Sequence, residues 1–517
     1  MSPMQRIPVS EESFEAPLPA SVGRLVRSGA KWVVALMLIR QFINIGTTAV
    51  LSRILPASDF GLVAMVGTFT GFLMLVSDMG LSWATVQKER LEQDDIDIVF
   101  WAGAVLGGLA WAVCALSAPL VADFYKTAAL VPLCWVLGFS LFINGLTIQP
   151  TALLKRQMRQ RELAISQTGA VLVAGLVAVG LAFTGVGYWA LAAQSIIGAL
   201  VLLAMAFYWS GYRPAFPGHS GGAISLLKFG GYVGACNIIT FLQGNLDNIL
   251  IGRYCGADEL GFYSRACLLR TLPAMYAAMA LTDVMVPALA AIQSDRQRLG
   301  IAFTKAITLV AFVGCPIAAC LGVTAEESVR LIYGPRWAPV VPLLALLSFP
   351  ALVLPLLQPM GWLLIATGKV RQMFLISAST LPLFGICYYV AVGWGARGVA
   401  LAAAVLYTVP VPLISVYFAH AAAGLSLRRT LRAVLPVILA CVGAAVAALA
   451  VGSWVAWWGV SWVLVLGVKL MVGALIYFSL AIYLVRPLPI HQLEQLAVRV
   501  RRIFCSCVVR KTSAGET

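Results

Sequence analysis

Residues 53–61 of the 517-residue chain read RILPASDFG, and residues 253–261, 200 positions later, read RYCGADELG. Both stretches have arginine first, alanine fifth, an acid seventh and glycine ninth. Each also lies between two long apolar segments. One match of this length arises easily by chance, so an internal repeat needs further matches in the same order.

The apolar segments define the class of protein. Hydrophobic residues make up 61% of the chain and charged residues only 11%, about half the charged share of soluble domains. About 20 apolar residues span a bilayer as a helix. The sequence predicts an all-α polytopic membrane protein with about fourteen transmembrane helices, near 32–52, 60–81, 97–119, 128–149, 165–183, 186–209, 229–251, 262–290, 301–323, 339–366, 372–392, 398–419, 432–451 and 460–484.

Two further matches support the repeat. Residues 149–150 and 358–359 both read QP, each followed by RQM at 156–158 and 371–373, and residues 190–193 and 400–403 both read ALAA. The three matches keep their order, at offsets of 200, 209 and 210. Six predicted helices separate the copies. Because six is even, the two six-helix lobes have the same orientation and are related by an axis along the membrane normal.

The basic residues give a topology. Of the 36 Lys and Arg residues, 26 fall on the side that holds the N-terminus, 6 on the other side and 4 inside apolar segments. Basic loops mark the cytoplasmic face, so both termini are predicted to be cytoplasmic. The net charge of +15 is spread over these loops, which argues against a nucleic-acid partner.

These observations predict six parts of the chain. They are a cytoplasmic N-terminal segment (1–31), an N-lobe (32–209), a cytoplasmic linker (210–228), a C-lobe (229–419), two extra helices (420–485) and a cytoplasmic, amphipathic, basic tail (486–517). A basic amphipathic tail is typical of a helix on the membrane surface, so membrane lipids are expected partners. A disordered basic end is the alternative.

No pattern indicates catalysis or a cofactor. The chain has no Walker A sequence, no HExxH and no GxSxG, and no connection is long enough for a catalytic domain. The 11 cysteines and three histidines show no metal-binding spacing. We therefore expect no enzyme activity, no cofactor and no metal.

Two polar faces are candidates for a substrate site. In the first helix, Arg40, Asn44, Thr47 and Thr48 share one face. The offset of 200 maps Thr47 onto Asp247, and the matching face of the seventh helix holds Asn237, Gln243, Asp247 and Asn248. Equivalent surfaces of two halves are expected to meet at a central cavity. The alternative is a hydrogen-bonded helix–helix seam, but charged Arg40 and Asp247 are costly to bury, which favours the cavity.

Further polar residues lie within the helices. Arg270 is deep enough to bind an anion, whereas Arg265 is near a helix end and is the weaker candidate. Gln149 and Gln358, at equivalent repeat positions, complete the predicted substrate site. Asp78, Asp247 and Asp283 are the candidates for ion coupling. Lys469, on the extra helices, is expected to make a local pair.

The sequence resembles a known superfamily. DFGLVAM at 59–65, NLDNILIG at 245–252 and LGFYSRA at 260–266 are similar to the multidrug/oligosaccharidyl-lipid/polysaccharide (MOP) flippase superfamily, in its bacterial polysaccharide and lipopolysaccharide exporter branch. The resemblance implies two lobes in a V, alternating access, and residence in the bacterial inner membrane. It also implies an undecaprenyl-pyrophosphate-linked oligosaccharide as cargo, for exopolysaccharide or lipopolysaccharide synthesis.

The function predicted from the sequence is thus a flippase for a lipid-linked oligosaccharide. Polysaccharide polymerase and co-polymerase proteins are candidate partners. A small-molecule antiporter of the same fold is the nearest alternative. A membrane polymerase or ligase is a further one, but it needs a larger outer loop than residues 324–338 provide.

Overall fold

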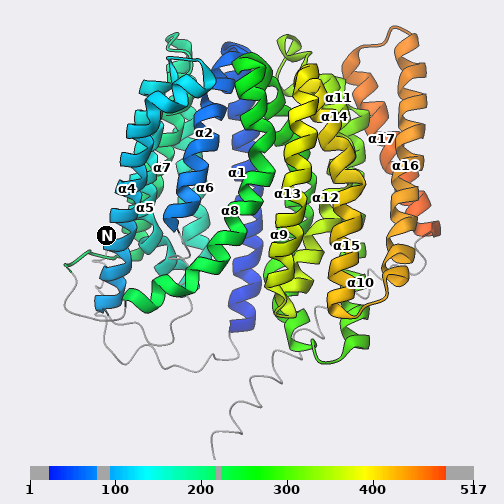
Figure 1. Cartoon of the computed structure of the whole chain (residues 1–517). Coiled ribbons are helices and arrows are strands. Elements are labelled where there is room, and N and C mark those ends of the chain that lie inside the picture. The colour runs from blue at the N-terminus through cyan, green and yellow to red at the C-terminus, as the bar shows by residue number, and fades with distance from the viewer. Residues whose placement is uncertain (1–21, 79–92, 217–222, 485–517) are drawn as a thin grey trace, which may run out of the picture.

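The structure, a computed structural model, describes residues 22–78, 93–216 and 223–484, and every regular element in them is a helix. Eleven spans in these residues are long and apolar enough to cross a membrane. One of them, 371–421, contains two crossings, and two more helices, α8 and α9, run the height of the bundle (Figure 1). Each of the fourteen predicted crossings therefore corresponds to a helical crossing in the described chain.

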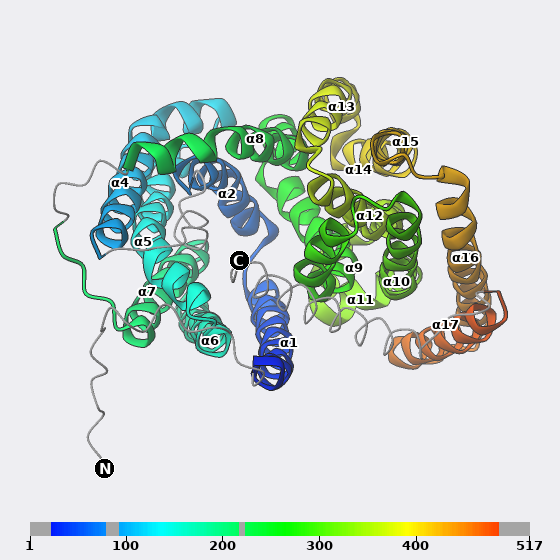
Figure 2. The ribbon, with the colours of Figure 1, turned by 90° about the horizontal axis from the view of Figure 1, so that it is seen from below.

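The first six crossings form the N-lobe. They are α1 (Val22–Ile54), α2 (Ala57–Asp78), α4 (Gln93–Tyr125), α5 (Leu130–Arg156), α6 (Gln160–Phe183) and α7 (Trp189–Ser210). In Figure 2 they lie together on one side of the molecule, with α1 beside α6. The connections after α1, α4 and α6 lie at the end drawn uppermost in Figure 1, which we call the upper end.

The C-lobe repeats this arrangement with additions. Its elements are α8 (Ala223–Tyr254), α9 (Gly256–Ala291), α10 (Arg296–Val323), α11 (Ala325–Ile332), η2 (Pro335–Trp337), α12 (Val340–Ala366), α13 (Val370–Ala391), η3 (Val392–Trp394), α14 (Gly395–Thr408) and α15 (Pro410–Ala423). A hairpin of α16 (Leu427–Trp457) and α17 (Trp462–Leu484) packs on its far side, against α10 (Figure 2).

The helix boundaries differ from the predictions in three places. The single helix predicted at 398–419 is two helices, because Pro410 has no backbone N–H and a new helix begins there. The connection 324–338 contains α11 and η2 rather than a simple loop. α8 begins at Ala223, inside the predicted linker 210–228. The predicted tail at 486–517 lies outside the described residues.

The hydrophobic cores show how the lobes are joined. The largest cluster is at the upper end and takes buried residues from both lobes, among them Leu51, Met65, Ile251 and Leu343. A second cluster belongs to the C-lobe and the hairpin, and a small third cluster, around Phe100, belongs to the N-lobe. The described lobes thus share one core at the upper end and have separate cores below it.

The acid of the repeated motif has the same structural role in both lobes. Glu259 at the start of α9 accepts a hydrogen bond from the backbone N–H of Ala396, in the first turn of α14, at 2.7 Å. Its repeat equivalent, Asp59 at the start of α2, lies against Gly187 in the turn before α7. Each acid therefore fixes the connection before the sixth crossing of its own lobe.

Candidate functional site

The lobes meet at the upper end through a backbone crossing of α2 and α9. A Cβ atom on Gly61 would lie 1.8 Å from the carbonyl oxygen of Ala257, and one on Gly261 would lie 2.0 Å from that of Ala57. Only glycine permits this approach. The two contacts are reciprocal, since the repeat equivalents of Gly61 and Ala257 are Gly261 and Ala57, as expected across a two-fold axis. This confirms the parallel relation of the two lobes.

A second reciprocal contact flanks the crossing. Ser52 of α1 is buried, and its hydroxyl donates to the Tyr333 carbonyl at 3.3 Å. Its repeat equivalent, Gly252 of α8, is so close to Tyr125 that a Cβ atom would lie 2.7 Å from the ring. Trp337 adds a stronger bond, from its indole N–H to the Ser52 carbonyl at 2.7 Å.

The two repeated arginines lie at the same interface. Arg53 donates to the Leu331 carbonyl at 3.0 Å. Its equivalent, Arg253, stacks on Phe124 with its guanidinium carbon 5.5 Å from the ring centre. Each arginine thus contacts the opposite lobe at the connection between the third and fourth crossings. We call this set of inter-lobe contacts at the upper end the upper closure.

Aromatic rings fill the centre of the upper closure. Trp337 packs edge-on against Phe60 of the N-lobe at 5.3 Å and Phe262 of the C-lobe at 5.6 Å. Arg265 lies over Phe60 at 4.6 Å, and the Tyr333 hydroxyl donates to its carbonyl at 3.3 Å. Arg265, a weak substrate candidate in the sequence, is therefore part of the closure.

The polar face of α1 points toward its own lobe. Arg40 donates to the amide oxygen of Gln167 in α6, and Thr47 lies so close to Gly175 of α6 that a Cβ atom there would be 2.5 Å from its hydroxyl. A groove of about 220 Å³ runs between α1 and α6 beside Thr47. In the described conformation Arg40 and Thr47 thus contact α6 of their own lobe. Asn44, on the same face, is partly exposed.

The charged residues of α8 and α9 form a buried cluster inside the C-lobe. The Tyr263 hydroxyl donates to Asp247 at 2.7 Å, and Arg270 lies over the ring of Tyr407 at 5.4 Å. Asp247 is 2% exposed and Arg270 is 7% exposed. Within the described chain these two form no ion pair within 4.0 Å, and two guanidinium nitrogens of Arg270 have no hydrogen-bond partner. The cluster is therefore buried within the C-lobe.

The other predicted residues are not gathered at one place. Gln243 of α8 donates to Thr380 of α13 at 3.1 Å, and Asn248 contacts Asn245 on its own helix. Gln149 is fully buried in α5, whereas Gln358 in α12 is exposed. The side chains of Asp78, Asn237 and Asp283 lie outside the described residues. The structure therefore divides the predicted site among a seam, a buried cluster and a closure.

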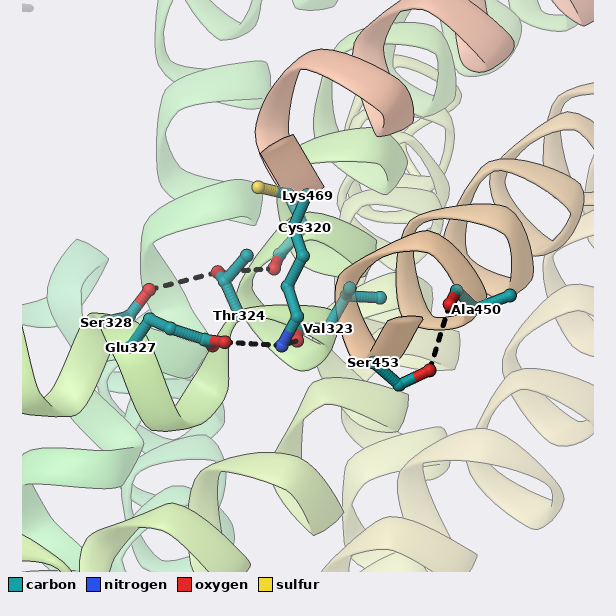
Figure 3. Close-up of polar contacts among 8 residues, drawn as sticks. All are labelled: Cys320, Val323, Thr324, Glu327, Ser328, Ala450, Ser453 and Lys469. Atoms are coloured by element: carbon teal, nitrogen blue, oxygen red, sulfur yellow. Dashed lines mark hydrogen bonds and ion pairs between the residues drawn. The ribbon is translucent and has the colours of Figure 1, made fainter. Parts of the chain in front are cut away.

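The sequence predicted only one member of a buried ion pair. The Lys469 ammonium of α17 lies 2.5 Å from Glu327 of α11 and donates to the Val323 carbonyl at 3.2 Å (Figure 3). The local pair predicted for Lys469 is confirmed. Glu327 was missed because residues 324–338 looked like an exposed loop. Apolar residues three or four apart around it, at 325, 329 and 332, are the signal for a short helix.

Two lobes of six crossings, related by a two-fold axis along the helices, make up a fold that solved structures of two other membrane proteins share. The lipid II flippase MurJ, in an inward closed conformation, has a TM-score of 0.68 at 12% identity, over 87% of this chain and 98% of that one. An inward-facing multidrug resistance MATE family transporter of the MOP superfamily has a TM-score of 0.61 at 13% identity, over 77% and 99%.

The sequence narrows the class to a family. A profile of polysaccharide biosynthesis proteins matches residues 50–342, more than half of the chain, so the chain belongs to the polysaccharide biosynthesis protein family. It is similar to the lipopolysaccharide biosynthesis protein WzxC of Escherichia coli K12, with 27% identity over 353 residues, which cover 67% of this chain and 71% of WzxC. The chain is therefore a multi-pass membrane protein of this family.

Proposed function

We propose that this protein is a flippase that moves an undecaprenyl-pyrophosphate-linked oligosaccharide across the bacterial inner membrane by alternating access. The upper closure is the observation that carries the proposal. It joins two equivalent lobes at the upper end, through contacts that a rotation of one lobe against the other would break. Further down, the described lobes also meet where α2 contacts α8, at Phe72 and Phe241. The second and third hydrophobic clusters each stay on one side of the lobe boundary, which fits a movement of one lobe against the other.

The charge distribution supports an orientation. The N-terminal side, where 26 Lys and Arg residues gather, corresponds to the lower end of the bundle. We therefore place the upper closure at the outer face and both termini in the cytoplasm. In this orientation the described conformation is closed to the outside, and a lipid-linked precursor made in the cytoplasm would enter from the lower end.

We assign the two deep arginines different roles. Arg40 is partly exposed on α1, and its guanidinium has a single hydrogen bond within the described chain, to Gln167. It is the better ligand for the pyrophosphate, because its planar fork matches two phosphate oxygens. Arg270 is buried beside Asp247 and would reach substrate only if the C-lobe opened.

The buried cluster fits ion coupling better than substrate contact. Asp247 has a charged neighbour, Arg270, and one hydroxyl donor, Tyr263, in an apolar interior. A cation or proton that binds Asp247 changes the balance of charge in that interior. We propose Asp247 as the coupling residue, with Asp78 and Asp283 as further candidates.

Reconstitution tests the function directly. The purified protein is placed in liposomes that carry a fluorescent undecaprenyl-pyrophosphate oligosaccharide in the inner leaflet, and transfer to the outer leaflet is followed by quenching. We expect transfer above the rate of empty liposomes. The antiporter alternative predicts a different result, in which the lipid stays in its leaflet while small organic cations exchange against a proton or sodium gradient. That result would replace the flippase proposal.

A further inference from the structure

The two lobes differ where the third and fourth crossings connect. In the N-lobe four residues, 126–129, join α4 to α5. In the C-lobe residues 324–339 join α10 to α12 and contain α11 and η2. The hairpin α16–α17 also has no counterpart in the N-lobe. The C-lobe therefore has two additions, one at the upper closure and one on its outer side.

These two additions contact each other. Glu327 of α11 and Lys469 of α17 form the buried ion pair of Figure 3, with side chains 8% and 13% exposed. The stem of Lys469 passes over Gly452 of α16, where a Cβ atom would lie 2.6 Å from it. Arg330, one turn further along α11, lies over the ring of Trp462 at the start of α17, at 5.1 Å.

The C-terminal end of α11 and the residues after it form part of the upper closure. Leu331 accepts from Arg53, and Tyr333 and Trp337 bond to Ser52. α11 is eight residues long, or about 12 Å at 1.5 Å per residue. This short helix therefore contacts the hairpin through Glu327 and Arg330, and α1 of the opposite lobe through Leu331.

The ion pair fixes position more than it adds stability. Burying two charges costs several kcal/mol, and within the described chain the second carboxylate oxygen of Glu327 has no hydrogen-bond partner. An apolar pair would fill the same space at less cost. The two buried charges are tolerated only while they face each other. The pair therefore holds α11 at one place along α17.

We propose that the α16–α17 hairpin braces the upper closure, and that Glu327 and Lys469 are positioning residues that hold α11 against α1. The proposal rests on the proposed function in one respect: it takes the upper closure to be a contact that opens and closes during alternating access. Loss of the pair should release α11, weaken the contacts to Ser52 and favour the state that is open at the upper end.

The test measures the accessibility of Ser52, which is 1% exposed. A Ser52→Cys variant in a cysteine-free background is labelled with an impermeant thiol reagent in right-side-out and inside-out vesicles, and abundance is measured on the same samples. We expect Glu327→Gln and Lys469→Met to raise the labelling rate about tenfold, within the range typical of coupled sites. Ser453→Ala is the matched control, since its hydroxyl bonds only to Ala450 on its own helix.

A charge exchange keeps the test decisive if the single variants do not accumulate. Glu327→Lys combined with Lys469→Glu restores an ion pair, so we expect normal abundance and the low labelling rate of the parent. Unchanged labelling in abundant single variants, or high labelling in an abundant exchanged variant, would overturn the brace. Labelling requires no substrate, so its outcome is independent of whether the cargo is a lipid-linked oligosaccharide.

Discussion

Replacing Gly61 by alanine should open the upper closure. The added Cβ atom would lie 1.8 Å from the Ala257 carbonyl oxygen. Cβ atoms essentially never come within 3.0 Å of a non-bonded heavy atom. The two backbones must therefore separate by about 1.2 Å, the difference between these distances. No side-chain rotation relieves the clash, because the atom it meets is backbone.

The strain acts only on the closed state, so it shifts the conformational equilibrium. Overpacking of this kind costs about 1–3 kcal/mol. Such a bias changes the ratio of the two states about 5- to 150-fold. We expect Gly61→Ala to raise thiol labelling at Ser52→Cys by a factor in this range and to slow lipid transfer in the liposome assay.

Three further variants isolate the cause. Gly67 is on the same helix with no heavy atom near its would-be Cβ, so Gly67→Ala should leave labelling unchanged. Gly261→Ala should match Gly61→Ala, because its contact with Ala57 is the reciprocal one. The double variant should cost less than the sum, since one separation relieves both clashes. Equal labelling of Gly61→Ala and Gly67→Ala would refute the reasoning.

Three other results are expected. Cysteines at Ser294 and Glu326 should be labelled from opposite faces, with only the second reacting in intact cells; the reverse pattern would contradict the orientation. Arg40→Ala should cost about 1.5–3 kcal/mol of a charge-assisted contact and impair polymer export at normal abundance, whereas exposed Arg298→Ala should not. Burial and nearby Glu259 raise the pKa of Cys255 to about 11, so as a sole cysteine it should alkylate slowly at neutral pH and about tenfold faster per pH unit below that pKa.

The crossings were predictable because lipid imposes strong constraints. Each needs about 20 apolar residues, and the bias of Lys and Arg toward one face fixes the direction of each. The break at Pro410 was missed because the apolar run continues through it, although the missing N–H of proline was a readable signal. α11 was missed because Glu326, Glu327, Ser328 and Arg330 make an eight-residue helix resemble a polar loop.

The candidate site was less predictable, for a geometric reason. Helical spacing shows that Arg40 and Thr47 share a face, but not which helix that face meets. The structure puts it against α6 of the same lobe. The repeat at 53–61 and 253–261 predicted two equivalent lobes, but the sequence does not reveal that Gly61 and Gly261 lie against the backbones of Ala257 and Ala57.

The upper closure is controlled by two features together: its central glycine contacts are reciprocal, and its flanking contacts differ between the two sides. A rotation that separates Gly61 from Ala257 also separates Gly261 from Ala57, so the crossing opens as a unit. The flanking contacts are unequal. Tyr125 only packs against Gly252, whereas the α11 side adds hydrogen bonds from Ser52 and Trp337. Opening therefore costs more on the α11 side, which is the side attached to the hairpin through Lys469. A change at the ion pair between Glu327 and Lys469 therefore acts on the α11 side, where the contacts are stronger. Because the two sides of the crossing open together, its effect also reaches the other side.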